Sequence, residues 1–301
     1  MTSGEADITR LYTAVEEAAA LLGVDCSRDA MWPALTAFQD VLTDGSVVFN
    51  MVTSGGHIGD LSFDFTMPTA AGDPYTRALT HGLVDDTDHP IRTLFADIQA
   101  RFPIQSYGVD HRLNGGFNKA YVFFPLSDLQ DPARLADQLP SAPSGLQEHL
   151  RTFTAHGLDN KVSAIAIDYA RRTWNLYFNG LSPDHVIRES ALSLIRELGL
   201  PDPSDQLLSF IETSSALYPT FGWDSTKVER LSFSTRTTDP RALPALLEPK
   251  LGEFAAHAPY TYDGDRVLVY AGALSRSEEY YKLATYHQLA TAAHDRIRTA
   301  S

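Results

Sequence analysis

The strongest constraint on the fold of this chain is a set of predicted β-strands that are apolar on one face and polar on the other. Side chains alternate across a strand, so every second residue shares a face. In the stretch 117–124 one face carries Phe117, Lys119, Tyr121 and Phe123. In 228–236 it carries Arg230, Ser232, Ser234 and Arg236, and in 171–179 it carries Arg171, Thr173, Asn175, Tyr177 and Asn179. Cations beside tyrosines on several strands indicate a closed sheet with a polar, cationic interior and an apolar outside covered by helices.

The expected elements follow one pattern, two helices and then two strands, which repeats five times. Strands are expected at 46–53, 60–67, 106–112, 117–124, 162–169, 173–178, 216–223, 228–237, 266–274 and 279–287. Helices are expected at 8–23, 28–42, 73–82, 90–102, 146–156, 183–198, 205–213, 241–247, 250–256 and 289–299. The first strand of each pair recurs about every 50–60 residues, a regularity that indicates a repeated architecture.

Ten antiparallel strands can close into a barrel that is wide enough to enclose a ligand. We therefore predict an α+β fold, in which a ten-stranded antiparallel β-barrel is surrounded by an outer ring of α-helices in five ααββ repeats. No linker or low-complexity segment interrupts the pattern, so we expect one domain over residues 1–301.

Composition and charge narrow the classes of partner. The chain is 44% hydrophobic, and its 38 acidic residues exceed its 24 basic residues to give a net charge of −14. Such a surface repels nucleic acid and anionic lipid, so we expect neither nucleic acid nor membrane as a partner. The same acidity makes an inward cluster of lysine and arginine unusual, because that cluster opposes the overall field.

Targeting signals and cysteine usage point to the cytoplasm. The first residues lack a basic region followed by an apolar run, and no apolar segment approaches the roughly 20 residues that span a bilayer. The one cysteine, Cys26, excludes an internal disulfide and a cysteine-cluster metal site. We expect a cytoplasmic monomer.

Several long stretches, ordered along nearly the whole chain, resemble one family. They are VEEAAALLGV, TAFQDVL, GDPY, GGFNKAYVFFP, NLYF, IRELGLP, YPTFGWDSTKVERLSF and EEYYKLATYH. The chain resembles the soluble aromatic prenyltransferases of the NphB and CloQ type, whose α-β-β-α units form the prenyltransferase barrel (ABBA fold). It is most similar to members that prenylate phenols and naphthols.

The resemblance implies transfer of an allylic isoprenoid from its diphosphate to a carbon of an aromatic small molecule, which are the two expected partners. Positions that bind the diphosphate in the family correspond here to Lys119, Arg171, Thr173, Asn175, Tyr218, Arg230 and Lys282. Three tyrosines are the expected catalytic residues: the rings of Tyr121 and Tyr218 would face the carbocation, and Tyr286, or water held near it, would take the proton. The pocket for the prenyl chain and the acceptor corresponds to Ser62, Asp64, Tyr121, Ser163, Tyr177, Ser215, Ala216, Phe221, Ser234, Ala284 and Tyr286.

Two departures from the phenol- and naphthol-prenylating members concern the substrates. Arg171 replaces a lysine, which keeps the charge but changes its geometry. Phe221 replaces a smaller aliphatic residue, and we expect it to narrow the chamber. The resemblance favours a geranyl donor over a dimethylallyl donor, and it leaves the natural acceptor open.

A third departure concerns metal. The magnesium-dependent relative has an aspartate where this chain has Ser62, and a serine hydroxyl is a poor sole protein ligand for Mg²⁺. We therefore predict that no cofactor is required, that no metal ligand is essential and that the enzyme works without Mg²⁺. Asp60 and Asp64 flank Ser62 at two-residue spacing on the same predicted face, and one of them would bind a metal if any were used.

Three other functions compete with carbon prenylation. O- or N-prenylation of a related heteroaromatic would use the same pocket. A noncatalytic barrel that binds hydrophobic aromatics would keep the chamber but give the cations no purpose. An isoprenyl diphosphate synthase would need DDxxD motifs, whereas the acidic run 85–88 is followed by His89.

Overall fold

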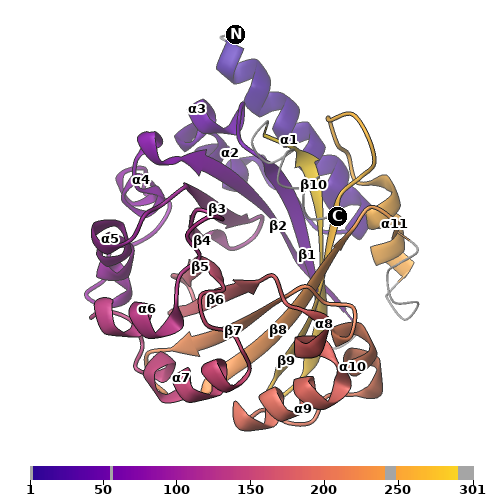
Figure 1. Cartoon of the computed structure of the whole chain (residues 1–301). Helices are drawn as coiled ribbons and strands as arrows, with labels where there is room; N and C mark the ends of the chain where they lie inside the picture. Colours follow the sequence, from indigo (N-terminus) through magenta and orange to yellow (C-terminus); the bar gives the residue numbers. More distant parts are fainter. Residues whose placement is uncertain (1–2, 55–56, 241–248, 291–301) are drawn as a thin grey trace.

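The protein is described here from a computed structural model that covers residues 3–54, 57–240 and 249–290. Its strands form one closed antiparallel barrel, in the order β1-β10-β9-β8-β7-β6-β5-β4-β3-β2 (Figure 1). The strands are β1 (Val47–Ser54), β2 (His57–Pro68), β3 (Ser106–Arg112), β4 (Gly116–Phe123), β5 (Val162–Asp168), β6 (Thr173–Asn179), β7 (Ala216–Gly222), β8 (Val228–Thr237), β9 (Leu268–Ser275) and β10 (Glu279–Gln288). The predicted ten-stranded barrel is confirmed.

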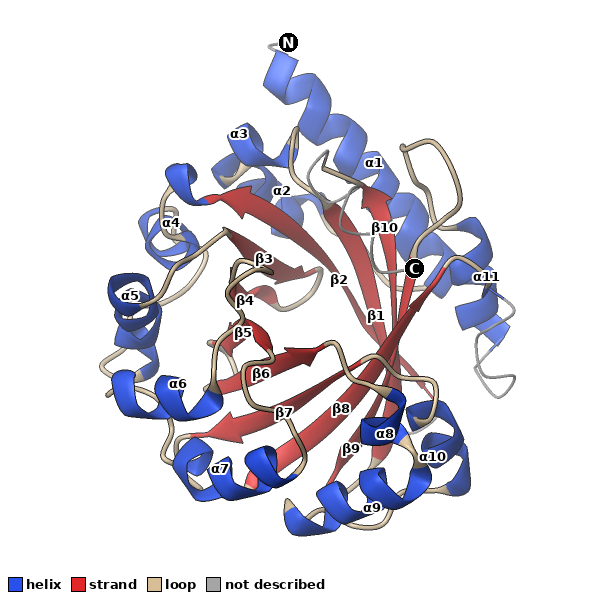
Figure 2. Cartoon of the chain, viewed as in Figure 1, coloured by secondary structure: helices blue, strands red, loops and turns tan. Residues whose placement is uncertain are grey.

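The helices lie outside the strands and form the predicted outer ring (Figure 2). They are α1 (Ser3–Leu22), α2 (Arg28–Ala37), α3 (Gln39–Leu42), α4 (Pro74–Thr80), α5 (Ile91–Arg101), α6 (Pro132–Gln138), α7 (Gly145–Ala155), α8 (Pro183–Val186), α9 (Arg188–Glu197), α10 (Asp205–Ile211) and α11 (Pro249–His257). A short 3₁₀ helix covers Thr69–Ala71. None of the helices in the described ranges is long and apolar enough to cross a membrane.

The apolar strand faces pack under the helices, as the alternation predicts. In β6, Trp174 and Phe178 are fully buried on the outer face, and the Phe178 ring lies 5.2 Å from that of Phe153 in α7. At Gly272 in β9, a Cβ atom would come within 2.5 Å of the Leu207 side chain of α10, so glycine permits the close approach of that helix. The core of the protein is therefore the layer between barrel and helices, and the barrel interior is left to polar residues.

Two predicted helices are divided. The stretch 28–42 breaks at Phe38, which has φ −116° and ψ 14° and places its ring 5.0 Å from that of Phe65 in β2. The stretch 183–198 breaks at Ile187, where the backbone is extended with ψ 145°. The predicted helices at 241–247 and, beyond its first two residues, at 289–299 lie outside the described residues.

A β-bulge changes the predicted face of Phe117. The β3–β4 pairing shifts between Asp110 and His111, so Asn118 is an extra residue in β4. Phe117 then packs 5.9 Å from Tyr169, which stacks on Tyr75 of α4 outside the barrel. The prediction that Phe117 shares a face with Lys119 was wrong, because sequence alternation does not register an inserted residue.

Candidate active site

Four cationic side chains gather at the hairpin end of the barrel: three lie in the interior, and Arg171, whose side chain is 53% exposed, lies at the rim. Lys119 comes from the start of β4, Arg230 from the start of β8 and Lys282 from β10. Arg171 lies in the turn between β5 and β6, one residue before Arg172 with its positive φ of 53°, and not on the strand as predicted. Burial, followed by the positive charges of Arg230, Lys119 and Arg171, holds the pKa of Lys282 well below its ordinary value.

Carboxylates compensate only part of this charge. Lys119 Nζ lies 3.4 Å from Asp110 Oδ2, and an Arg171 guanidinium nitrogen lies 3.5 Å from Asp168 Oδ2. Lys282 makes no ion pair with any carboxylate of the described residues; its Nζ lies 5.6 Å from the centre of the Tyr280 ring. Within the same ranges, the buried Nε of Arg230 has no hydrogen-bond partner. An excess of cationic donors in a desolvated interior is a site for a multiply charged anion.

Next to the cations, aromatic rings form a continuous wall across β4, β6 and β7. The Tyr177 and Tyr218 rings stack at 4.6 Å, and Tyr121 and Tyr177 meet edge to face at 6.2 Å. Tyr121 stacks in turn on Phe123 at 5.8 Å. Burial raises the pKa of Tyr121, Tyr177 and Tyr218, so all three rings are neutral. We refer to Phe123, Tyr121, Tyr177 and Tyr218 as the aromatic wall.

Polar side chains predicted for the site accompany the cations and the wall. Thr173 and Asn175 of β6 are buried, and the Oδ1 atom of Asn175 has no hydrogen-bond partner among the described residues. Ser234 of β8 faces Ala216 of β7 across the ladder, and Ala284 of β10 faces Asn50 of β1. Ser62 of β2 also faces Asn50. These residues alternate with outward-facing apolar neighbours, so they lie on the interior face.

Tyr286 lies on the same face of β10 as Lys282 but four residues further along. At about 3.3 Å per residue, that separation is about 13 Å along the strand. It pairs with Val48 of β1, near the end of the barrel where helices connect the strands. The structure therefore keeps Tyr286 in the interior but separates it from the cations.

Phe221 does not line the chamber, so the prediction that it narrows the pocket was wrong. Its side chain is fully buried on the outer face of β7, with ring centroids 6.4 Å from Phe153 and from Trp174. Phe221 is three residues from the interior Tyr218 and pairs with the outward-facing Trp174 of β6, so the ordinary alternation of β7 places it outside the barrel.

Two predicted pocket serines lie at the margin of the chamber. Ser215 is exposed just before β7. Ser163 is the extra residue of a bulge in β5; its hydroxyl donates to the Tyr177 carbonyl at 3.2 Å and accepts from Asn179 at 2.6 Å.

The two aspartates of β2 point to different places. Asp60 accepts hydrogen bonds from the backbone N–H and side-chain amide of Asn114, at 3.2 and 3.1 Å, in the β3–β4 turn. The β1–β2 register shift between Met51 and Thr53 separates Asp60 from the interior face, which corrects the prediction that it shares a face with Asp64. Asp64 lies inside the barrel, and no group of three or more His, Cys, Asp and Glu side chains in the described ranges could hold a metal ion.

Asp110 and Asp168 belong to the site but were not predicted. Asp110 lies opposite both Asp64 and Lys119 in the ladders, and Asp168 lies opposite Lys119 and Thr173. The signal for Asp110 was present in the sequence, since it falls on the polar face of 106–112, in the hairpin that also contains Lys119.

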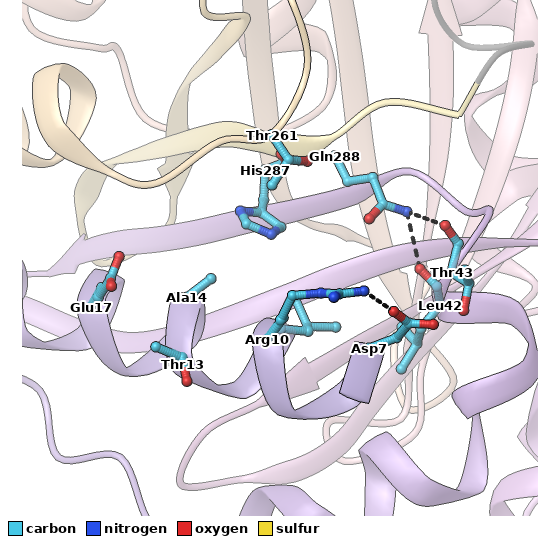
Figure 3. Close-up of a pocket in the computed structure, with 11 residues that line it drawn as sticks. Asp7, Arg10, Thr13, Ala14, Glu17, Leu42, Thr43, Thr261, His287 and Gln288 are labelled. Carbon is cyan, nitrogen blue, oxygen red and sulfur yellow. Dashed lines mark hydrogen bonds and ion pairs between the residues drawn. The ribbon is translucent and has the colours of Figure 1, made fainter. Parts of the chain in front are cut away.

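A surface pocket of about 360 Å³ lies elsewhere, between α1 and the end of β10 (Figure 3). Its polar groups already bond to one another: Arg10 pairs with Asp7, and the Gln288 amide donates to the carbonyls of Leu42 and Thr43 at 3.0 and 2.9 Å. The pocket contains none of the interior cations, so the barrel interior is the candidate active site.

A closed ten-stranded barrel with interior cations beside an aromatic wall defines the class of prenyltransferase barrels. The model of the family "Aromatic prenyltransferase Orf2" matches residues 6–295, and the chain belongs to that family. It is therefore an aromatic prenyltransferase, which belongs to the transferases of alkyl or aryl groups other than methyl. The expected class is confirmed.

Curated relatives cover almost the whole chain. Flaviolin linalyltransferase from Streptomyces virginiae is 43% identical over 291 residues, which are 97% of this chain and 96% of the relative. 5,10-Dihydrophenazine-1-carboxylate 9-dimethylallyltransferase from Streptomyces anulatus is 40% identical over 286 residues, or 95% of each chain. The furaquinocin biosynthesis prenyltransferase of Streptomyces sp. (strain KO-3988) is 40% identical over 282 residues, or 94% of this chain and 91% of the relative.

Solved structures share the fold at low sequence identity. The 6-dimethylallyltryptophan synthase of Micromonospora olivasterospora, in complex with DMASPP and Trp, has a TM-score of 0.57 at 13% identity and covers 94% of this chain and 97% of its own. NotF in complex with brevianamide F and DMSPP has a TM-score of 0.59 at 11% identity and covers 93% and 92%.

Proposed function

We propose that this enzyme transfers an allylic isoprenoid from its diphosphate to a ring carbon of a phenolic or naphthol-type secondary metabolite. The supporting observation is the set of four cations at the hairpin end of the barrel, three interior and Arg171 at the rim, in which Lys282 has no carboxylate partner and Arg230 Nε has no hydrogen-bond partner within the described residues. Lys119, Arg171, Arg230 and Lys282 would bind the diphosphate, helped by Thr173, Asn175 and Tyr218. A barrel that only binds aromatics would gain nothing from holding these cations together, since their mutual repulsion is unfavourable.

The proposed chemistry follows from the charges that develop. Breaking the allylic C–O bond leaves a diphosphate of high negative charge and a delocalised carbocation. Fixed lysine and arginine side chains stabilise the leaving group most strongly where water is excluded. Neutral tyrosine rings stabilise the cation by about 0.5–2 kcal/mol each, and the closed chamber keeps water from capturing it.

The donor and the position of attack belong to the same proposal. We favour geranyl over dimethylallyl diphosphate as the donor and carbon over oxygen or nitrogen as the attacked atom. One of the relatives is named for linalyl transfer and another for dimethylallyl transfer. The connectivity of the product, determined by NMR, distinguishes C-prenylation from O- or N-prenylation.

Activity without added metal is the first test of this function. Enzyme treated with EDTA is expected to prenylate 1,6-dihydroxynaphthalene with geranyl diphosphate, and mass spectrometry detects the product. Dimethylallyl diphosphate in a parallel reaction tests the donor preference. Two features support the prediction that Mg²⁺ is not required: Ser62 lacks a carboxylate, and the Asp60 carboxylate is hydrogen-bonded to Asn114. Turnover that disappears with EDTA and returns with Mg²⁺ contradicts the metal prediction but not the transferase.

The lowered pKa of Lys282 predicts that this residue lowers the stability of the folded protein while it contributes to diphosphate binding. In the unfolded chain the Lys282 ammonium has a pKa near 10.4. Between about pH 10.4 and the lower pKa of Lys282 in the folded protein, Lys282 is therefore protonated in the unfolded state and neutral in the folded state. Stability therefore falls as the pH falls through this window, and the penalty is complete below the folded pKa. Lys282→Met should raise Tm at neutral pH by roughly 2–4 °C. Pyrophosphate should raise the Tm of the wild type by more than it raises the Tm of the variant, in which three of the four cations remain.

Differential scanning fluorimetry measures both effects. Lys227→Met is the matched control, because Lys227 is an exposed lysine in the β7–β8 turn and should change neither value. A Lys282→Met variant that is less stable than the wild type, or whose Tm rises with pyrophosphate as much as that of the wild type, would contradict the role of Lys282.

We also propose that the enzyme acts as a monomer, because the chamber is closed by strands of one chain. Light scattering during size-exclusion chromatography measures the mass directly. A mass of two chains that persists on dilution would contradict this.

A further inference from the structure

Two aspartates lie side by side inside the barrel, between the cations and the aromatic wall. Asp64 of β2 is directly opposite Asp110 of β3 in the ladder. Asp110 is on the side of the cations, since its Oδ2 lies 3.4 Å from Lys119 Nζ. Asp64 is on the side of the wall, since its Oδ2 accepts a hydrogen bond from the Tyr121 hydroxyl at 3.4 Å. The diphosphate role assigned above uses neither carboxylate.

The two carboxylates are compensated unequally. Asp110 Oδ2 accepts from the Asn118 amide at 3.0 Å and pairs with Lys119, whereas Asp110 Oδ1 is buried without a hydrogen-bond partner in the described residues. Asp64 Oδ2 accepts from Tyr121, the Asn50 amide is a second polar neighbour, and Asp64 Oδ1 is buried with no hydrogen-bond partner among the described residues. Nearly all buried polar atoms in proteins are hydrogen-bonded, so an unpartnered carboxylate oxygen in a substrate chamber calls for a functional explanation.

We propose that Asp64 is the proton acceptor of the transfer reaction, a role that rests on the prenyltransferase function proposed above. The allylic C–O bond breaks and its electron pair leaves with the diphosphate. A pair of ring π electrons of the acceptor forms the new C–C bond, which leaves that carbon with both a hydrogen and the prenyl group. The C–H bond then breaks, its electrons restore the aromatic ring, and the proton passes to a carboxylate oxygen of Asp64.

Other interior groups suit this role less well. The phenols of Tyr121, Tyr177 and Tyr218 stay protonated, because burial raises the pKa of each. Tyr286 lies about 13 Å along β10 from Lys282. Asp110 is paired with Lys119 through Oδ2, on the side of the cations and not at the aromatic wall. Asp64 is thus the carboxylate with an oxygen available at the aromatic wall.

The charges around Asp64 make it a stronger base than an ordinary carboxylate. Burial first, and then the negative charge of Asp110, raises the pKa of Asp64, while Lys119, Asn50 and Tyr121 oppose this shift. Tyr177 also faces Asp64 from β6 and is neutral. A proton acceptor works best when its pKa is closer to the working pH, which is the direction of the shift here.

The test compares Asp64→Asn, Asp64→Glu and the control Asp60→Asn. Asp60 lies on the same strand but bonds to Asn114 at the rim, so Asp60→Asn should have wild-type activity. All reactions contain EDTA, with geranyl diphosphate as donor and 1,6-dihydroxynaphthalene as acceptor. Asp64→Asn should lower kcat by about 100-fold, the usual size of a general-base contribution, and Asp64→Glu should recover part of it.

An isotope effect separates proton removal from a merely structural role. With acceptor deuterated at the attacked carbon, the wild type should show an effect near unity, because C–O cleavage limits the rate. In Asp64→Asn, loss of the proton becomes limiting and the effect should rise well above unity. A slow variant whose isotope effect stays at the wild-type value, or a variant with unchanged kcat, would overturn the proposal.

Calorimetric binding of geranyl thiolodiphosphate, which resists C–O cleavage, separates this inference from the proposed function. Asp64→Asn should bind the analogue as the wild type does. If every variant binds the analogue and forms product at the wild-type rate, the proposed transferase function stands and Asp64 is not the proton acceptor. Absence of binding and of product in the wild type would remove the proposed function itself. Tm values confirm folding, and Asp64→Asn should be no less stable, because it removes a buried charge.

Discussion

Replacing Arg230 with alanine is expected to lower kcat/KM for the prenyl diphosphate by about 100- to 1000-fold, as the loss of a single preorganised donor does in other enzymes. Arg230 is the interior cation whose Nε is buried and has no hydrogen-bond partner in the described part of the chain. Its donors act in a desolvated chamber, where the charge that develops on the leaving diphosphate is screened little. Steady-state kinetics with geranyl diphosphate measure the effect.

The pattern across variants distinguishes catalysis from general electrostatics. Lys227→Ala removes an exposed positive charge three residues before Arg230 and should keep wild-type kinetics. Arg230→Lys should recover only part of the loss, because a lysine keeps the charge but not the planar fork of donors. If Arg230→Ala and Lys227→Ala had equal effects, Arg230 would not contact the diphosphate.

Replacing Phe221 with alanine should lower the free energy of unfolding by about 3–5 kcal/mol, as large-to-small changes do in a well-packed core. Phe221 is fully buried and contacts Phe153, Trp174 and His149, all in the layer between β7 and α7. The ratio of geranyl to dimethylallyl turnover should stay at its wild-type value. Urea unfolding and competition between the two donors measure the two quantities.

Phe123→Ala is the contrasting variant, because Phe123 belongs to the aromatic wall inside the barrel and stacks on Tyr121. Phe123→Ala should change the ratio of geranyl to dimethylallyl turnover, and it should lower the free energy of unfolding by less than Phe221→Ala does. A Phe221→Ala enzyme with wild-type stability and an altered donor ratio would place Phe221 in the chamber after all.

The sequence predicted the strands well, because each half-buried strand repeats with a period of two. β3 and β8 begin and end where the alternation of 106–112 and 228–237 predicts. The same alternation identified Lys119 and Arg230 as interior residues. The resemblance added Lys282 and Tyr218, whose roles no pattern in the sequence would have revealed.

Two of the errors occur where the ladder loses its register, whereas the error at Phe221 came from the resemblance, since the alternation of β7 already turns Phe221 outward. An inserted residue in β4 reverses the face of Phe117. A shift in β2 separates Asp60 from Asp64. Bulges depend on how two strands pair, and a single sequence does not record that pairing. The same limit hid the Asp64–Asp110 pair, which exists only once β2 and β3 are aligned.

The pairing of β1 with β10 has a consequence for how the protein is made. It joins segments from opposite ends of the chain; Thr53 bonds the Tyr281 carbonyl across 228 residues. During synthesis, the outer edge of β1 has no partner until the ribosome has released almost the entire polypeptide. Unpaired strand edges invite association between chains, and contacts so distant in sequence form slowly. Production of this barrel therefore depends on protecting one edge of its first hairpin until the last strand arrives.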